Sequence, residues 1–224
     1  IIPHMQTRIL LVFTGGTIGS LSENGNIDLD PKARFKLLEL FKQRYPNSAA
    51  IDFKPVQALQ ILSENLHPLD WTTLIETIES ENPDAFDGII ITHGTDTLAF
   101  SASALGLYFN HLDKPVLMVS SNLPLENPDA NGIPNLIAAV DFIVQAKAAG
   151  VFVAYQNPGK ILEIHQATRL SSCLPLSGDF MSIQSKSFMR YEAGRFEQLY
   201  PLTTTAQLKV KADFSARILL VRPY

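Results

Sequence analysis

The chain has 224 residues, of which 46% are apolar and 18% charged, and its 12 glycines and 14 prolines are close to average usage. These values exclude a collagen, a disordered tail and a low-complexity linker. They leave a globular protein with enough chain for one large domain, or for one domain and a fragment of a second. The formal net charge of −4, without a basic stripe, argues against nucleic acid as a partner.

Two features bear on where the protein works. Cys173 is the only cysteine, which excludes an internal disulfide and suits a reducing compartment. The longest apolar runs are far too short to cross a bilayer, and no signal-peptide pattern leads the chain. We therefore expect a cytoplasmic protein with no membrane partner. We interpret residues 1–4 as a cloning remnant and Met5 as the native start.

Strand-like and helix-like segments alternate over the first two thirds of the chain. Solidly apolar runs bounded by turn residues predict buried strands, and apolar residues spaced by three and four predict helices. In chain order we predict a strand at 8–13, a helix at 31–45, a strand at 53–62, a helix from 67, a strand at 88–92, a helix at 97–109, a strand at 115–119, a helix at 134–149 and a strand at 151–154. Two of the predicted helices have favourable start signals. Asp30 can cap the helix that begins at Pro31, and Pro134 can take the first position of the helix at 134–149.

Five strands separated by four helices predict an α/β fold with a parallel sheet that helices cover on both faces. Burial of both faces explains why these strands are apolar throughout and do not alternate. Ligands of such folds bind beyond the carboxyl ends of the strands. The residues that follow each strand are therefore the candidates for chemistry.

The pattern weakens after residue 155. Residues 161–167 are compatible with one arm of a β-hairpin, and residues 168–190 are rich in serine with few apolar runs. Residues 203–216 have the composition of a linker, and the apolar run at 217–221 predicts one more strand. We predict one α/β domain at 5–202, a linker at 203–216, and the start of a second domain at 217–224, the rest of which is absent.

The first and third strands end in short polar motifs. Residues 14–19 read TGGTIG, and the two adjacent glycines allow a sharp turn and a close approach to a ligand. Residues 92–97 read THGTDT and come directly before an alanine-rich helix. A tight turn and helix capping are the ordinary explanations, but capping accounts for one polar residue and not for four around a glycine. Backbone N–H groups at such a helix start can also hold a carboxylate or an oxyanion.

Polar residues follow the other two strands as well, with SEN at 63–65 and SSN at 120–122. No cluster of His, Cys and Asp has metal-site spacing, and we take Cys173 and the scattered histidines as structural. The groups at this edge permit attack by a threonine hydroxyl that a base activates. From the residues alone, a small-molecule amide or ester hydrolase and an amino-acid-binding domain both remain open.

The motifs TGGTI at 14–18 and HGTDT at 93–97, in this order and each after a strand, resemble the two signatures of the bacterial-type L-asparaginase/glutaminase family. The resemblance covers residues 8 to about 155 and is looser beyond. Supporting matches lie in several short segments: Ser63-Glu64 with Pro68 and Asp70-Trp71, Lys114-Pro115-Val116, Leu123-Pro124-Leu125, Asn131-Gly132 and Asn135.

The resemblance implies an N-terminal three-layer α/β domain, a linker and a smaller C-terminal domain. The implied reaction is hydrolysis of the side-chain amide of L-asparagine to L-aspartate and ammonia, without a cofactor, in a homo-oligomer. It makes Thr17 the nucleophile and Thr95 the second threonine, working with Asp96 and a lysine, while Ser63 and Asp96 bind the α-carboxylate and α-amino groups. The other implied substrate-binding residues are Gly16, Glu64, Gly94 and Ser121.

Three departures from the family pattern stand out. The family's lysine falls in a Thr-Lys pair, and the best match here is Thr168-Arg169, where arginine keeps a positive charge but cannot give up a proton. A family tyrosine in the loop after the first motif falls at Asn26. That loop, 20–28, is rich in Ser, Asn and Gly and would suit a lid. The C-terminal domain, which helps complete a neighbouring subunit's site in the family, is absent.

Three functions therefore remain. The first is an L-asparaginase-type amidohydrolase with Thr17, Thr95, Asp96 and Ser63 intact. The second is a degenerate amino-acid-binding domain on the same fold, and the third is an amidase or esterase for another small substrate. The sequence does not separate asparagine from glutamine.

Overall fold

A computed structural model describes residues 6–16, 18, 20–23, 26–29, 33–146, 148–202 and 208–215. A sheet of eight strands, in the order β10-β9-β8-β7-β6-β5-β1-β4, runs through the molecule. Its strands are β1 (Thr7–Gly15), β4 (Ile51–Ile61), β5 (Gly88–Thr92), β6 (Pro115–Val119), β7 (Gly150–Tyr155), β8 (Leu162–Gln166), β9 (Met189–Glu192) and β10 (Arg195–Gln198). Strands β4, β1, β5, β6 and β7 are parallel, and β8, β9 and β10 continue the sheet antiparallel. The predicted parallel sheet is confirmed.

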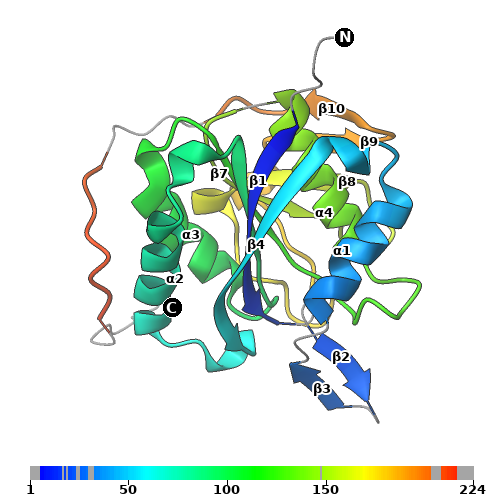
Figure 1. Ribbon diagram of the computed structural model, residues 1–224, viewed down its shortest axis with the longest axis horizontal. Helices are drawn as coiled ribbons and strands as arrows, with labels where there is room; N and C mark the ends of the chain where they lie inside the picture. Colours follow the sequence, from blue (N-terminus) through cyan, green and yellow to red (C-terminus); the bar gives the residue numbers. More distant parts are fainter. Residues whose placement is uncertain are drawn as a thin grey trace.

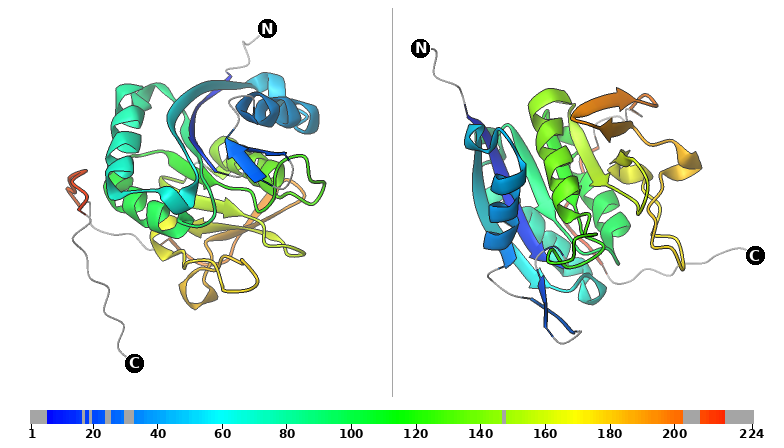
Figure 2. Two further views of the ribbon diagram at one scale, coloured as in Figure 1. Left: turned by 90° about the horizontal axis from the view of Figure 1, so that it is seen from below. Right: turned by 90° about the vertical axis from the view of Figure 1, so that its right-hand side faces the viewer.

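Helices cover both faces of the sheet (Figures 1 and 2). They are α1 (Ala33–Arg44), α2 (Pro68–Ser80), α3 (Leu98–Tyr108) and α4 (Gly132–Asp141). The helices α1 and α4 share one apolar cluster with alternate residues of β1, including Ile9 and Leu11. On the other face, α2 and α3 share a second cluster with Leu10 and Val12. Because successive side chains of a strand point to opposite faces, the apolar run of β1 supplies both layers.

Several predicted boundaries need correction. The helix at 134–149 is α4, which begins at Gly132, so Pro134 is its third residue, and a π-helical turn (Phe142–Ala146) continues it. The loop at 20–28 is not a loop but a two-stranded ribbon of β2 (Ser20–Glu23) and β3 (Asn26–Leu29), which extends away from the sheet in Figure 1. Asn26 begins β3. The strands β9 and β10 were not predicted, because four-residue strands with exposed side chains have no long apolar run.

The chain after residue 202 falls only partly within the described residues. The predicted strand at 217–221 and the first linker residues, 203–207, lie outside them. Residues 208–215, which the linker prediction includes, run extended beside α2 and α3 (red in Figure 1). No helix among the described residues has the length and apolar character needed to cross a bilayer.

Candidate active site

The connections that leave β1 and β5 run to opposite faces of the sheet. After β1 the chain goes to α1, in one apolar layer, and after β5 it goes directly into α3, in the other. Since β1 and β5 are neighbours in the sheet, their carboxyl ends form a topological switch point, and ligands of such folds bind in the crevice outside it. Both sequence motifs are located at these two strand ends.

The glycine pair after β1 brings the first motif against the second. Gly15 and Gly16 both have left-handed backbone angles, with φ of 101° and 76°. The Gly16 N–H donates to the carbonyl of Ile61, at the end of the neighbouring strand β4, over 3.1 Å. A Cβ atom on Gly16 would lie only 2.5 Å from the backbone nitrogen of Gly94. Gly16 is therefore required both for its conformation and for this close approach.

Ser63 and Asp96 form a hydrogen-bonded pair at the same edge. The Ser63 hydroxyl donates to Asp96 Oδ2 over 2.9 Å and accepts the Asp96 backbone N–H at 3.2 Å. The Thr97 hydroxyl donates to the Ser63 carbonyl over 3.0 Å. A side chain at Gly94 would collide with Ser63, because a Cβ atom there would lie 2.4 Å from the hydroxyl oxygen. Ser63 is buried and Asp96 is exposed, so the pair presents a carboxylate to a ligand in the crevice.

Thr95 stands just ahead of the first turn of α3. Its side chain is half-buried, and its hydroxyl has no hydrogen-bond partner among the described residues. Asp96 likewise has no ion-pair partner in the described part of the chain. The start of α3 adds the partial positive charge of a helix N-terminus beside these two side chains. Thr17, the predicted nucleophile, lies outside the described residues, between Gly16 and Ile18.

His93 is buried directly behind this edge. Its backbone N–H donates to the Val119 carbonyl over 2.9 Å, which joins β5 to β6. Its ring Nδ1 lies 2.7 Å from the Gly94 carbonyl oxygen, an acceptor, so Nδ1 carries a proton. The other ring nitrogen, Nε2, is buried and has no hydrogen-bond partner within the part of the chain that the structure describes. Burial lowers the pKa of His93 below its usual 6.5, so the ring is neutral and fixes the Gly94 peptide.

Ser121 and Glu64 are less directly placed for a ligand. Ser121 follows β6 at the same edge, but it is fully buried and its hydroxyl donates to the Leu123 carbonyl over 2.5 Å. Glu64 is next to Ser63 in the chain, and its side chain is exposed. The predicted role of Ser121 in substrate binding would need its hydroxyl to leave this carbonyl.

A network of side-chain amides holds the loops after β6 and β7, and motif reasoning gave it no role. Asn122 and Asn131 exchange backbone-to-side-chain hydrogen bonds over 2.8 and 3.0 Å. Asn135, fully buried in α4, donates to the Ser120 carbonyl and accepts the Gln156 N–H, both over 2.9 Å. The sequence signal that could have found this network is the group of three asparagines that follow β6, because a buried side-chain amide needs several hydrogen-bond partners.

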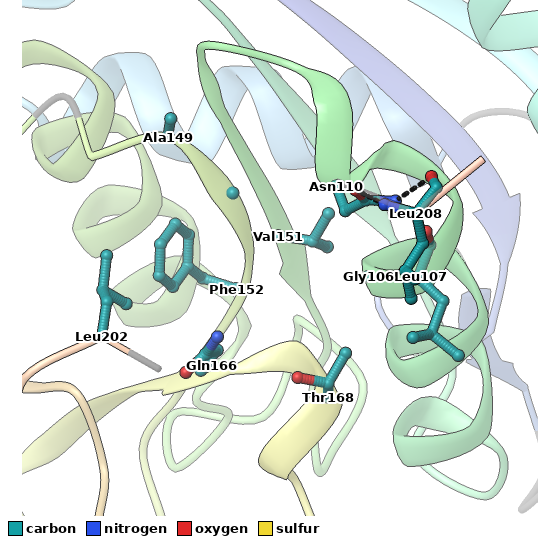
Figure 3. Close-up of a pocket in the computed structure, with 11 residues that line it drawn as sticks. Gly106, Leu107, Asn110, Ala149, Val151, Phe152, Gln166, Thr168, Leu202 and Leu208 are labelled. Atoms are coloured by element: carbon teal, nitrogen blue, oxygen red, sulfur yellow. Dashed lines mark hydrogen bonds between the residues drawn. The ribbon is translucent and has the colours of Figure 1, made fainter. Parts of the chain in front are cut away.

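The structure does not bring Arg169 to this site. The strand β8 runs antiparallel to β7, with Gln166 opposite Phe152, so residues after β8 emerge at the amino edge of the parallel strands. Figure 3 shows Thr168 there, lining a pocket with Gly106 near the end of α3. Arg169 points to the Ile183 carbonyl, 3.5 Å from it. The expectation that Arg169 replaces a catalytic lysine beside Thr95 is therefore not met.

The described residues hold no group of three or more His, Cys, Asp or Glu side chains that could bind a metal ion. What they bring together at the crevice is Gly16, Ser63, Gly94, Thr95 and Asp96. A carboxylate hydrogen-bonded to a serine suits a ligand ammonium group, and backbone N–H groups suit a carboxylate or a developing oxyanion. The arrangement fits a small zwitterionic ligand.

Comparisons with known proteins agree with this geometry. Residues 8–199 match the family described as "Asparaginase, N-terminal". The chain is 33% identical to an L-asparaginase of Thermococcus kodakarensis over 153 residues, which are 67% of this chain and 44% of that protein. It is 34% identical to L-asparaginase 1 of Escherichia coli K12 over 141 residues, which are 61% of this chain and 40% of that protein. The chain thus spans less than half the length of these relatives.

The fold comparison gives the same result. The crystal structure of L-asparaginase I from Vibrio cholerae superimposes with a TM-score of 0.74 and 25% sequence identity, covering 86% of this chain and 56% of that one. The family resemblance drawn from the two threonine motifs is thereby confirmed.

Proposed function

This chain belongs to the asparaginase family, and on that premise we propose that it provides the N-terminal domain of an L-asparaginase-type amidohydrolase. The observation that carries the proposal is the Ser63–Asp96 pair, 2.9 Å between oxygens, in which Ser63 lies against Gly94 of the second motif, and Gly94 in turn lies against Gly16 of the first. The substrate would be the side-chain amide of L-asparagine or L-glutamine. A cytoplasmic location and a homo-oligomer are proposed with it, from the single Cys173 and from the family.

In the proposed reaction the Asp96 carboxylate holds the substrate ammonium, and the Ser63 hydroxyl turns from Asp96 to the α-carboxylate, which the positive end of the α3 dipole also attracts. The Thr17 hydroxyl attacks the amide carbonyl carbon and forms an ester. Its proton passes to the leaving nitrogen, the C–N bond breaks, and ammonia departs. Water then attacks the ester, which releases L-aspartate or L-glutamate and restores the hydroxyl. Thr95 would relay the proton, and the absence of a partner for its hydroxyl among the described residues supports this role.

The test is ammonia release from L-asparagine and L-glutamine by the 224-residue chain and by Thr17→Ala. Loss of the nucleophile should lower the rate at least about 10³-fold, because nucleophile and base act as a unit. Thr168→Ala is the matched control. It removes the same hydroxyl at the opposite edge of the sheet and should leave the rate within about twofold. An equal rate for Thr17→Ala and the unchanged chain would rule out Thr17 as the nucleophile.

A second candidate is an amino-acid-binding domain that does not turn its ligand over. The observation in its favour is that Asp96 has no basic partner within the described residues, where the family places a lysine. If the chain is a binding domain, we expect no ammonia release from L-asparagine or L-glutamine, while L-aspartate still raises the melting temperature of the protein. Asp96→Asn should abolish that rise under both readings, because it removes the charge that faces the ammonium.

A further inference from the structure

Residues 208–215 form an extended segment, here termed the strap, that is attached to α2 and α3 at two places. At one end, the Asn110 side chain exchanges two hydrogen bonds of 2.9 Å with the backbone N–H and carbonyl of Leu208, drawn as dashed lines in Figure 3. At the other end, the Thr72 hydroxyl donates to the Ala212 carbonyl over 3.1 Å. Asn110 follows α3 and Thr72 lies in the first turns of α2, so the strap runs from the amino edge of the sheet toward the carboxyl edge.

The strap places one aromatic ring on the only tryptophan of the chain. Phe214 meets the Trp71 ring edge-on, with centroids 5.3 Å apart and the planes at 64°. Ala212 and Phe214 are half-buried, whereas Lys211, Asp213 and Ser215 between and beside them are exposed. This alternation is that of a strand-like segment with one face on the protein. An edge-on aromatic pair stabilises this docking beyond the area that it buries.

Trp71 connects the strap to the first turn of α3. Its indole Nε1–H donates to the hydroxyl of Ser101 over 2.8 Å, and Ser101 is fully buried. The Ser101 N–H bonds the Thr97 carbonyl over 3.0 Å, and the Thr97 hydroxyl bonds the Ser63 carbonyl. A continuous series of contacts therefore leads from Phe214 to the Ser63–Asp96 pair.

We propose that the strap positions Asp96, with Phe214 and Trp71 as the positioning residues. Trp71 is only half-buried, so its indole depends on Phe214 to stay in the orientation that reaches Ser101. With Phe214 removed, the indole gains rotational freedom, the Ser101 hydrogen bond weakens, and the start of α3 is held less firmly against Ser63. As far as ligand binding is concerned, this inference rests on the proposed function.

The first test needs no ligand. In Phe214→Ala we expect faster amide hydrogen exchange over residues 97–101 and a red shift of tryptophan fluorescence, all of which comes from Trp71. Phe196→Ala is the matched control, since it deletes a partly buried phenylalanine that packs in the other apolar layer. It should leave both signals unchanged. Unchanged exchange over 97–101 in Phe214→Ala would overturn the proposal.

The second test uses L-aspartate as the probe, measured by calorimetry. Phe214→Ala and Trp71→Phe should each weaken its binding about three- to tenfold, the effect of one lost hydrogen bond of ordinary strength. Phe214→Tyr keeps the ring and should restore the affinity. Weaker binding by Phe214→Ala that Phe214→Tyr fails to restore would also count against the strap. If the unchanged chain binds no L-aspartate, the proposed function fails, and the exchange experiment alone still decides the role of the strap.

Discussion

His165 is a second buried histidine, remote in the chain from the two motifs. It lies in β8 with no exposed surface, and its Nδ1 is 2.9 Å from the hydroxyl of Ser182. Its Nε2 has no hydrogen-bond partner among the described residues, and a Glu163 carboxylate oxygen lies 4.0 Å away. Burial lowers the pKa of His165 from 6.5 to about 4, so the folded protein holds the ring neutral at neutral pH.

This burial predicts sensitivity to acid. Between the two pKa values the unfolded chain binds a proton at residue 165 and the folded chain does not, so stability falls as pH falls from 6.5 toward 4. The loss from this one residue should reach about 2 kcal/mol at about pH 5 relative to pH 7. Urea unfolding at the two pH values measures it.

The variant His165→Asn separates this effect from general acid denaturation. Its amide can keep the hydrogen bond to Ser182 but cannot titrate, so the loss of stability between the two pH values should shrink by the same amount. Part of the pH dependence should remain, because burial lowers the pKa of His93 in the same direction. An equal pH dependence in His165→Asn and the unchanged chain would contradict the assignment.

At the scale of elements, a glycine-to-alanine substitution in the turn after β1 can be compared with the same substitution in another turn. The second turn has a similar backbone conformation but open space around its glycine. Gly16 and Gly159 have φ angles of 76° and 69°, but only Gly16 has neighbours that a Cβ atom would strike. Gly159→Ala should cost about 1 to 2 kcal/mol, the strain of a left-handed alanine. Gly16→Ala should cost about 1 to 3 kcal/mol more, since Gly94 must move. Equal losses in urea unfolding would show that the two motifs do not depend on this contact.

The elements that the sequence predicted well are the apolar ones. The strands β5 and β6 have the predicted bounds, because a continuous apolar run can only be accommodated inside a covered sheet. The helix α3, which packs against the sheet, differs by one residue at each end. The strands β9 and β10 escaped prediction for the opposite reason. Their residues are half-buried or exposed, and pairing with β8 determines their structure more than local pattern does.

At the scale of the whole molecule, the parallel strands send their following residues to one edge. That rule brought Ser63, Gly94 and Asp96 together from the sequence alone. It failed for Arg169, because β8 reverses direction and delivers its next residues to the other edge. The direction of a strand depends on its pairing partner, which a single sequence does not reveal. Beyond residue 155, the match of Thr168-Arg169 to the family's Thr-Lys pair therefore did not predict where Arg169 lies in the fold.

The opposite placement of Arg169 yields a prediction of its own. Arg169→Lys recreates the residue type of the family pattern, yet its ammonium would lie at the amino edge of the sheet. The rate of ammonia release should therefore change by less than about twofold, as for a surface substitution away from the site. A rise of an order of magnitude in a steady-state assay would mean that the side chain reaches Thr95 after all.

The position of β1 between β4 and β5 has a consequence for the order of events during synthesis. Among the strands of the sheet described here, β1 is made before both of its partners, β4, which begins at residue 51, and β5, which begins at residue 88. Until β4 has been made, its five apolar residues at 9–13 have no partner strand, and until β5 has been made they have a partner on one side only. Such a segment is a natural target for chaperones and for aggregation while translation continues. The nascent chain should be most vulnerable before β4 is complete, and it should stay partly exposed until β5 covers the second side of β1.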